Sequence, residues 1–153
     1  MIKRILFCLA IACLFSFNLN VAAGSPQSAN SIVIKNGWMQ LGPSSQKNTA
    51  AFMVVENHSS KEIALLSASS DVCKVVELHK MENVNEMMKM KKVDSVTIPA
   101  NGQTEFKPGG YHLMIIGLNR PLKDGEEVEI KLQFANAIQK TIRVPVKNRE
   151  SMQ

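Results

Sequence analysis

The sequence predicts an all-β fold, an antiparallel β-sandwich of seven to nine strands. Three observations lead to this prediction. Between positions 32 and 146, apolar residues repeat with a period of two rather than 3.6, β-branched residues are frequent in the apolar runs, and turn formers recur about every 8 to 12 positions. Short strands with such spacing pack face to face around a shared core.

The first half of the predicted domain contains five strand candidates. Loops rich in Gly, Pro, Ser and Asn interrupt them at 41–45 and 57–60. We expect Met39 and Met53, which lie on apolar strand faces, to be buried in the core. The candidates are residues 32–39, 49–56, 62–69, 74–80 and 87–93.

The second half contains five further candidates, separated by turns that combine Gly with Pro, Asn or Asp at 99–102, 108–110 and 123–126. The strand period is clearest after position 126, where Val128 and Ile130 alternate with polar residues. From these candidates we expect seven to nine strands in an immunoglobulin-like sandwich. The candidates are residues 96–98, 103–107, 112–117, 127–134 and 138–146.

The N-terminal segment has the pattern of a secretory signal peptide. Lys3 and Arg4 precede an apolar run at 5–17, and small residues end the segment at Ala23, the predicted cleavage site. Because the run is shorter than the roughly 20 residues of a membrane span, we expect an exported, periplasmic protein. An uncleaved anchor and a lipidated Cys13 are the alternatives.

The predicted organisation is a single domain with short flanking segments. The signal peptide covers 1–23, a flexible leader 24–31, the β-sandwich 32–146 and a polar tail 147–153. About 130 residues after cleavage are enough to bury a core in one domain.

The net charge and the aromatic content argue against a nucleic-acid-binding protein. Removal of Lys3 and Arg4 with the signal lowers the net charge from +5 to +3, and the chain has one Trp and one Tyr. A weakly basic chain with so few stacking residues does not predict nucleic-acid binding.

Of three cysteines only Cys73 remains after cleavage, so no internal disulfide can form. We expect Cys73 to be buried, the alternatives being an auxiliary ligand or an intermolecular disulfide.

Three short pairs of His and Met, each skipping one residue, predict a site for a soft metal. In a strand, residues i and i+2 point to the same face, so each pair presents two donors in one direction. Imidazole with thioether, and no thiolate or carboxylate, suits Cu(I) better than Zn, Ca or Mg. The competing interpretation is that the methionines fill the core. The pairs are His79 with Met81, Met88 with Met90, and His112 with Met114.

Other classes of function find less support in the sequence. An electron-transfer cupredoxin needs a Cys ligand near the end of the domain, and no Cys follows Cys73. The chain has no Gly-x-Ser-x-Gly motif and no recognisable phosphate loop, so we do not expect an enzyme. An exported β-sandwich that binds another protein and no metal remains an alternative. His58, in a polar turn without a sulfur partner, is expected to be an exposed loop residue.

The spacing His-x10-Met-x21-His-x-Met, formed by His79, Met90, His112 and Met114, resembles that of the PCu(A)C family of periplasmic copper chaperones. The surrounding segments 76–79, 88–90 and 107–112 are similar to those of the family. The resemblance covers residues 38–134.

The resemblance implies a cupredoxin-like β-sandwich that holds one Cu(I) per chain through these four residues. It also implies delivery of copper to the CuA site of cytochrome c oxidase subunit II, directly or through Sco-type partners. We expect a monomer with no membrane span in the mature chain. Unlike the tail of some members, 147–153 contains no His, and Met81 and Met88 are expected to be supporting or alternate ligands.

Overall fold

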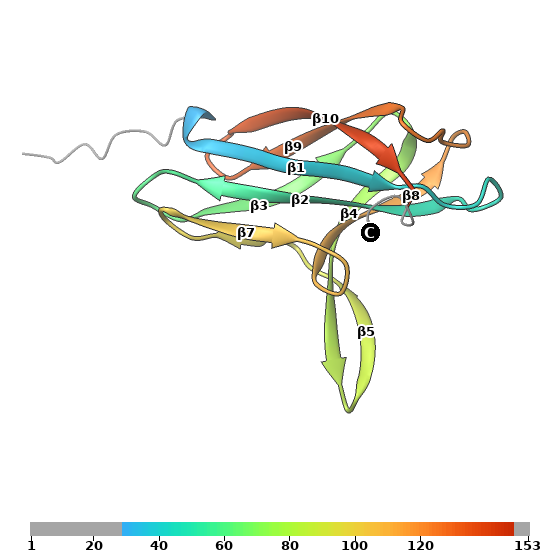
Figure 1. Cartoon of the computed structure of the whole chain (residues 1–153). Helices are drawn as coiled ribbons and strands as arrows, with labels where there is room; N and C mark the ends of the chain where they lie inside the picture. The colour runs from blue at the N-terminus through green and yellow to red at the C-terminus, as the bar shows by residue number, and fades with distance from the viewer. Residues whose placement is uncertain (1–28, 149–153) are drawn as a thin grey trace, which may run out of the picture.

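Strands make up most of the folded chain in a computed structural model that describes residues 29–148 (Figure 1). The predicted all-β class is confirmed. The predicted signal peptide, residues 24–28 of the leader and residues 149–153 of the tail lie outside the described part. Within residues 29–148, no helix has the length and hydrophobicity needed to cross a membrane.

The described chain begins with a short 3-10 helix, Ala29–Ser31, and continues as ten strands. The strands are β1 (Ile32–Gln40), β2 (Asn48–Asn57), β3 (Ile63–Ser69), β4 (Cys73–Val84), β5 (Met87–Lys92), β6 (Val96–Ile98), β7 (Gly102–Phe106), β8 (Tyr111–Leu118), β9 (Glu127–Phe134) and β10 (Gln139–Lys147).

All ten strands belong to one hydrogen-bonded sheet in the order β5-β4-β8-β7-β2-β1-β10-β9-β3-β6, and a β3–β4 pairing closes it into a barrel-like form. The predicted division into a two-sheet sandwich is therefore not confirmed, and the strand number exceeds the predicted seven to nine. Most strand pairs are antiparallel as predicted, but β1 pairs with β10 and β7 with β8 in parallel. A period of two identifies inward and outward faces but not the neighbour of each strand.

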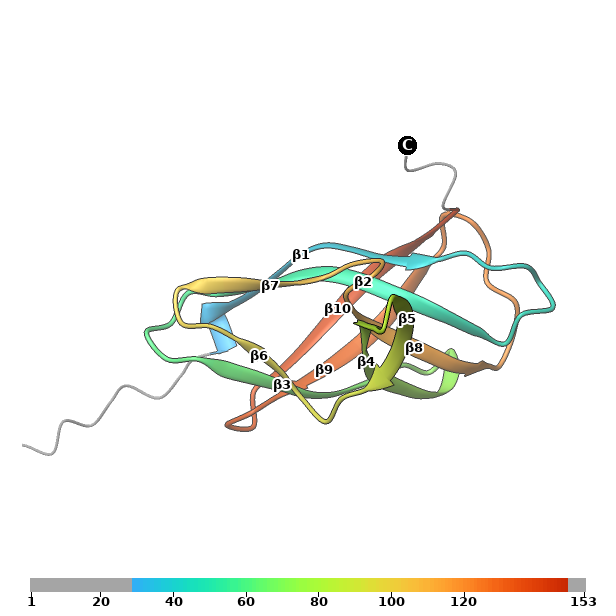
Figure 2. The ribbon, with the colours of Figure 1, turned by 90° about the horizontal axis from the view of Figure 1, so that it is seen from below.

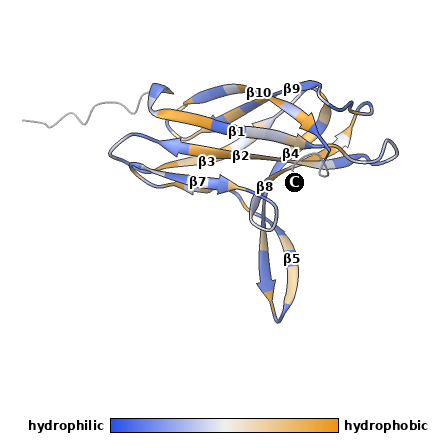
Figure 3. Ribbon diagram, viewed as in Figure 1, coloured by the Kyte–Doolittle hydropathy of each residue, from blue (hydrophilic) through white to orange (hydrophobic). Residues whose placement is uncertain are grey.

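The inner faces of the strands form one hydrophobic core. Val128 and Ile130 of β9 point inward as their spacing predicts, and Met39 and Met53 are buried as expected. Figure 3 shows the hydrophobic colour concentrated in the barrel strands. The predicted burial of Cys73 is also confirmed.

The hairpin of β4 and β5 projects from the barrel in Figure 1 and points toward the viewer in Figure 2, which is seen from below. β4 continues four residues beyond its predicted end at Lys80, to Val84. The two turn residues, Asn85 and Glu86, have φ values of 52° and 64°, which a type I′ hairpin turn requires. The sequence did not reveal this turn because Glu stands where such turns usually carry Gly.

Candidate metal centre

The two imidazoles of the predicted site face each other on neighbouring strands. His79 of β4 pairs with His112 of β8 in the antiparallel ladder, and their ring centroids lie 5.7 Å apart at an interplanar angle of 55°. Directly paired residues point to the same face of a sheet. Both rings therefore lie on the outer face, while their neighbours Leu78 and Leu113 point into the core.

A tight turn before β8 fixes the orientation of His112. The Gly110 N–H donates to the Lys107 carbonyl at 3.0 Å, and Gly109 has a φ of 78°. Proline at 108 followed by Gly with positive φ is the pattern of a type II turn. The Gly110 carbonyl accepts hydrogen bonds from His112 Nδ1 and from the Met81 N–H, both at 3.1 Å. With Nδ1 as the donor, Nε2 of His112 keeps the lone pair that a metal needs.

Burial favours the neutral form of the His112 ring. The residue is only 4% exposed, and desolvation lowers the pKa of His112. The hydrogen bond to the Gly110 carbonyl opposes this shift, while the charge of His79 adds to it. A neutral imidazole is the form that binds metals.

His79 has one occupied and one free ring nitrogen. Its Nε2 lies 2.9 Å from Glu77 Oε2, whereas its buried Nδ1 has no hydrogen-bond partner among the described residues. A buried polar atom without a partner is rare and indicates a ligand position. Lys92 lies 2.7 Å from the other Glu77 oxygen. Hydrogen bonds from Lys92 and then His79 lower the pKa of Glu77 despite partial desolvation.

The two predicted thioether ligands lie on the same outer face but differ in exposure. Met114 is half-buried on β8 opposite Glu77, next to the imidazole pair. Met90 pairs with Met81 across the β4–β5 hairpin and is 50% exposed. His79, His112 and Met114 therefore lie close together on the outer face of β4 and β8. Met90 lies on the same face at the base of the hairpin.

An aromatic pair borders the imidazoles on the side of β2. The Phe52 ring lies 6.4 Å from the His112 ring, and Trp38 lies 4.6 Å from Phe52. A bulge in β1 at Asn36 and Gly37 brings Trp38 opposite Phe52. Sequence reasoning did not identify Phe52 as a neighbour of the site, because the pairing of β8 with β2 has no local sequence signal. It also overlooked Glu77, although the i, i+2 spacing on β4 puts Glu77 and His79 on one face.

Two residues considered as ligands lie elsewhere. His58 follows β2 in an exposed loop, as predicted, and its Nε2 contacts Glu56 at 3.0 Å. Cys73 pairs with Leu118 at the opposite end of the β4–β8 ladder from His79. Burial raises the pKa of the Cys73 thiol, so the reactive thiolate is disfavoured.

The model of the family described as LpqE-like matches residues 32–146. The chain belongs to the LpqE-like family. A protein of Leifsonia xyli subsp. xyli (strain CTCB07), named "Putative lipoprotein Lxx21020", is 29% identical to this LpqE-like chain over 133 residues, or 86% of the chain and 79% of that protein.

Solved structures similar to this LpqE-like protein include PCuAC domains and the protein DR1885. The Cu(I) form of DR1885 from Deinococcus radiodurans is 31% identical, with 83% of this chain and 84% of that one covered and a TM-score of 0.62. The copper-bound PCuAC domain from PmoF2 has the same fold, with a TM-score of 0.66 at 20% identity and coverage of 77% and 93%. The resemblance to the PCu(A)C family is thus confirmed.

Proposed function

We propose that this LpqE-like protein is an exported copper chaperone that carries one Cu(I) bound by His79, Met90, His112 and Met114. The observation that carries the proposal is the opposed imidazole pair, in which the buried Nδ1 of His79 has no hydrogen-bond partner within residues 29–148. The Cu(I) form of the 31% identical DR1885 supports the choice of metal.

The ligand set suits a carrier rather than a permanent copper enzyme. Neutral imidazole and thioether are soft donors for Cu(I), and neither forms a disulfide in an oxidising compartment. Met90 is 50% exposed at the base of the projecting hairpin, where a partner's ligand can reach the metal. Release then proceeds by ligand exchange. An entering thiolate or imidazole replaces a thioether, and the oxidation state of copper does not change.

The recipient in this proposal is the respiratory oxidase assembly pathway, either the CuA site of cytochrome c oxidase subunit II or a Sco-type protein. A direct test mixes the Cu(I)-loaded protein anaerobically with the metal-free soluble domain of subunit II and, separately, with a Sco-type protein. Appearance of copper in one recipient after rapid separation supports delivery to it. Retention of all copper by the donor with both recipients contradicts this part of the proposal.

Three forms of the exported protein are consistent with its sequence. The first is the soluble periplasmic chain cut after Ala23, the second is a chain anchored by a lipid on Cys13, and the third retains the uncleaved apolar segment as an anchor. The name of the Leifsonia relative supports considering the second form. Mass spectrometry of the N-terminus of the protein from cells distinguishes a chain that begins at Gly24 from a diacylated chain that begins at Cys13.

A further inference from the structure

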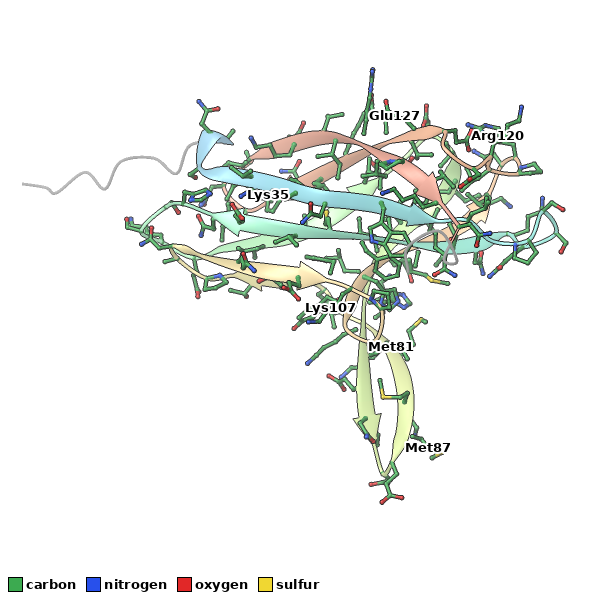
Figure 4. All side chains as sticks on the ribbon, viewed as in Figure 1. Lys35, Met81, Met87, Lys107, Arg120 and Glu127 are labelled. Atoms are coloured by element: carbon green, nitrogen blue, oxygen red, sulfur yellow. The ribbon has the colours of Figure 1, made fainter. Side chains whose placement is uncertain are left out.

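A set of methionines on the β4–β5 hairpin lies next to the proposed copper ligands without belonging to them. Met81 of β4 is directly opposite Met90 of β5, and Met88 is opposite Asn83. The same ladder pairs His79 with Lys92, so all these side chains point to the face that carries the imidazoles. Figure 4 shows Met81 where the hairpin leaves the barrel and Met87 near its tip.

Packing does not account for these side chains. β5 is an edge strand whose six residues are all exposed, and Met88 and Met90 are 55% and 50% exposed. Exposed large apolar residues that lie side by side indicate a binding function more often than isolated ones do. The thioethers of Met88 and Met90 are therefore available to a ligand, and Met81, directly opposite Met90, is partly exposed.

Their spacing allows the three sulfurs to meet at one ion. Directly opposite residues in an antiparallel pair have Cβ atoms about 4.5–5.5 Å apart, and diagonal neighbours lie about 7–8 Å apart, within reach of long side chains. Met81 and Met90 form the opposite pair, and Met88 is the diagonal neighbour of Met81. Methionine has three rotatable bonds, so its sulfur can adapt to an ion.

The lysines of the hairpin do not oppose a cation on this face. Lys80, Lys89 and Lys91 occupy the opposite face of the β4–β5 ladder. Lys92 shares the methionine face, but it lies 2.7 Å from a carboxylate oxygen of Glu77. A soft cation therefore meets uncharged thioethers there and no uncompensated ammonium group.

We propose that Met81, Met88 and Met90 form a second, weaker Cu(I) site through which copper enters and leaves the site of His79, His112 and Met114. The inference rests on the proposed function. Met90 is common to both ligand sets and stays bound while the metal moves. The bonds to the two imidazoles and to Met114 break as bonds to Met81 and Met88 form, and copper remains Cu(I).

The thioether site can be observed directly by NMR of the full chain labelled at the methionine methyl carbons. Ag(I), a redox-inert soft ion, is added to a His79→Ala, His112→Ala variant. The methyl signals of Met81, Met88 and Met90 should shift together, whereas that of Met87, which pairs with Val84 on the other face and is 58% exposed, should not. Unmoved signals of Met81 and Met88, or an equal shift of Met87, would overturn the proposal.

Transfer kinetics of chains with both imidazoles intact provide a second test. Cu(I) should pass from the loaded full chain to a chromophoric chelator more slowly in a Met81→Leu, Met88→Leu variant than in the wild type. The Met87→Leu control should transfer copper at the wild-type rate. Equal transfer rates in the double variant and the control would overturn the proposed entry site and leave the proposed function standing. A wild type that takes up no Cu(I) would instead contradict the proposed function and the entry site with it.

Discussion

Glu77 holds the imidazole of His79 from a position two residues earlier on the same strand. The Nε2–H of His79 donates to Glu77 Oε2 at 2.9 Å, and this leaves Nδ1 as the buried nitrogen that has no partner in the described part of the chain. Carboxylates that orient a metal-binding imidazole also raise its basicity. Glu77 is thus a positioning residue for the proposed copper site.

Replacing Glu77 by Ala should weaken Cu(I) binding about tenfold, the lower end of the usual effect of such partners. Without Glu77, the ring of His79 is no longer held in one orientation, and its proton is no longer fixed on Nε2. Competition against a Cu(I) chelator measures the affinity, and nitrogen NMR of His79 reports the tautomer. Glu82→Ala is the matched control, because Glu82 pairs with Lys80 on the other face of β4. Equal affinities of the two variants would argue against a positioning role.

Gly109→Ala should destabilise the fold by about 1–2 kcal/mol, because only Gly adopts its φ of 78° without strain. A Cβ at this position would meet no atom within 4 Å beyond its chain neighbours, so the effect is one of backbone conformation and not of collision. Urea unfolding measures the free energy of unfolding. Gly110→Ala is the control, since its added carbon meets its nearest atom at 3.4 Å and its φ is not positive. Similar losses in both variants would contradict the turn assignment.

The metal-free protein should lose stability as the pH falls below about 6.5, the ordinary pKa of His. Burial lowers the pKa of His112 in the folded state, so the unfolded chain takes up a proton that the folded chain excludes. The free energy of unfolding therefore rises with pH between the two pKa values. His112→Gln should reduce this dependence. A His58→Gln chain should retain the contribution of His112, and identical pH profiles of the two variants would refute this explanation.

Trp38 should report copper binding through its fluorescence. It is the chain's single Trp, and it packs against Phe52, which lies beside His112. A change in emission should therefore saturate at one equivalent of Cu(I). A His112→Ala chain should lose this signal, and an unchanged titration in that variant would place the metal elsewhere.

The sequence alone predicted the all-β class and the two strands that carry the imidazoles, because a period of two is a local property. The same period predicted that His112 and Met114 lie on one face. The closed sheet depends on β3 pairing with β4, a contact between strand edges that no local pattern records. The full length of the hairpin depends on a turn with Glu86 at a positive φ, where Gly is usual. Glu77 was missed although the i, i+2 spacing that groups His112 with Met114 also puts Glu77 on the face of His79.

The central claim is that His79, Met90, His112 and Met114 bind one Cu(I). An anaerobic Cu(I) titration of the protein against a chromophoric competitor tests it most directly. The comparison is between a His79→Ala, Met90→Ala chain and a His58→Ala, Met87→Ala control, which removes the same residue types from other positions. We predict one tight equivalent in the wild type and the control, and lost or greatly weakened binding in the first variant. Equal binding by both double variants, or no competition by the wild type, would contradict the account.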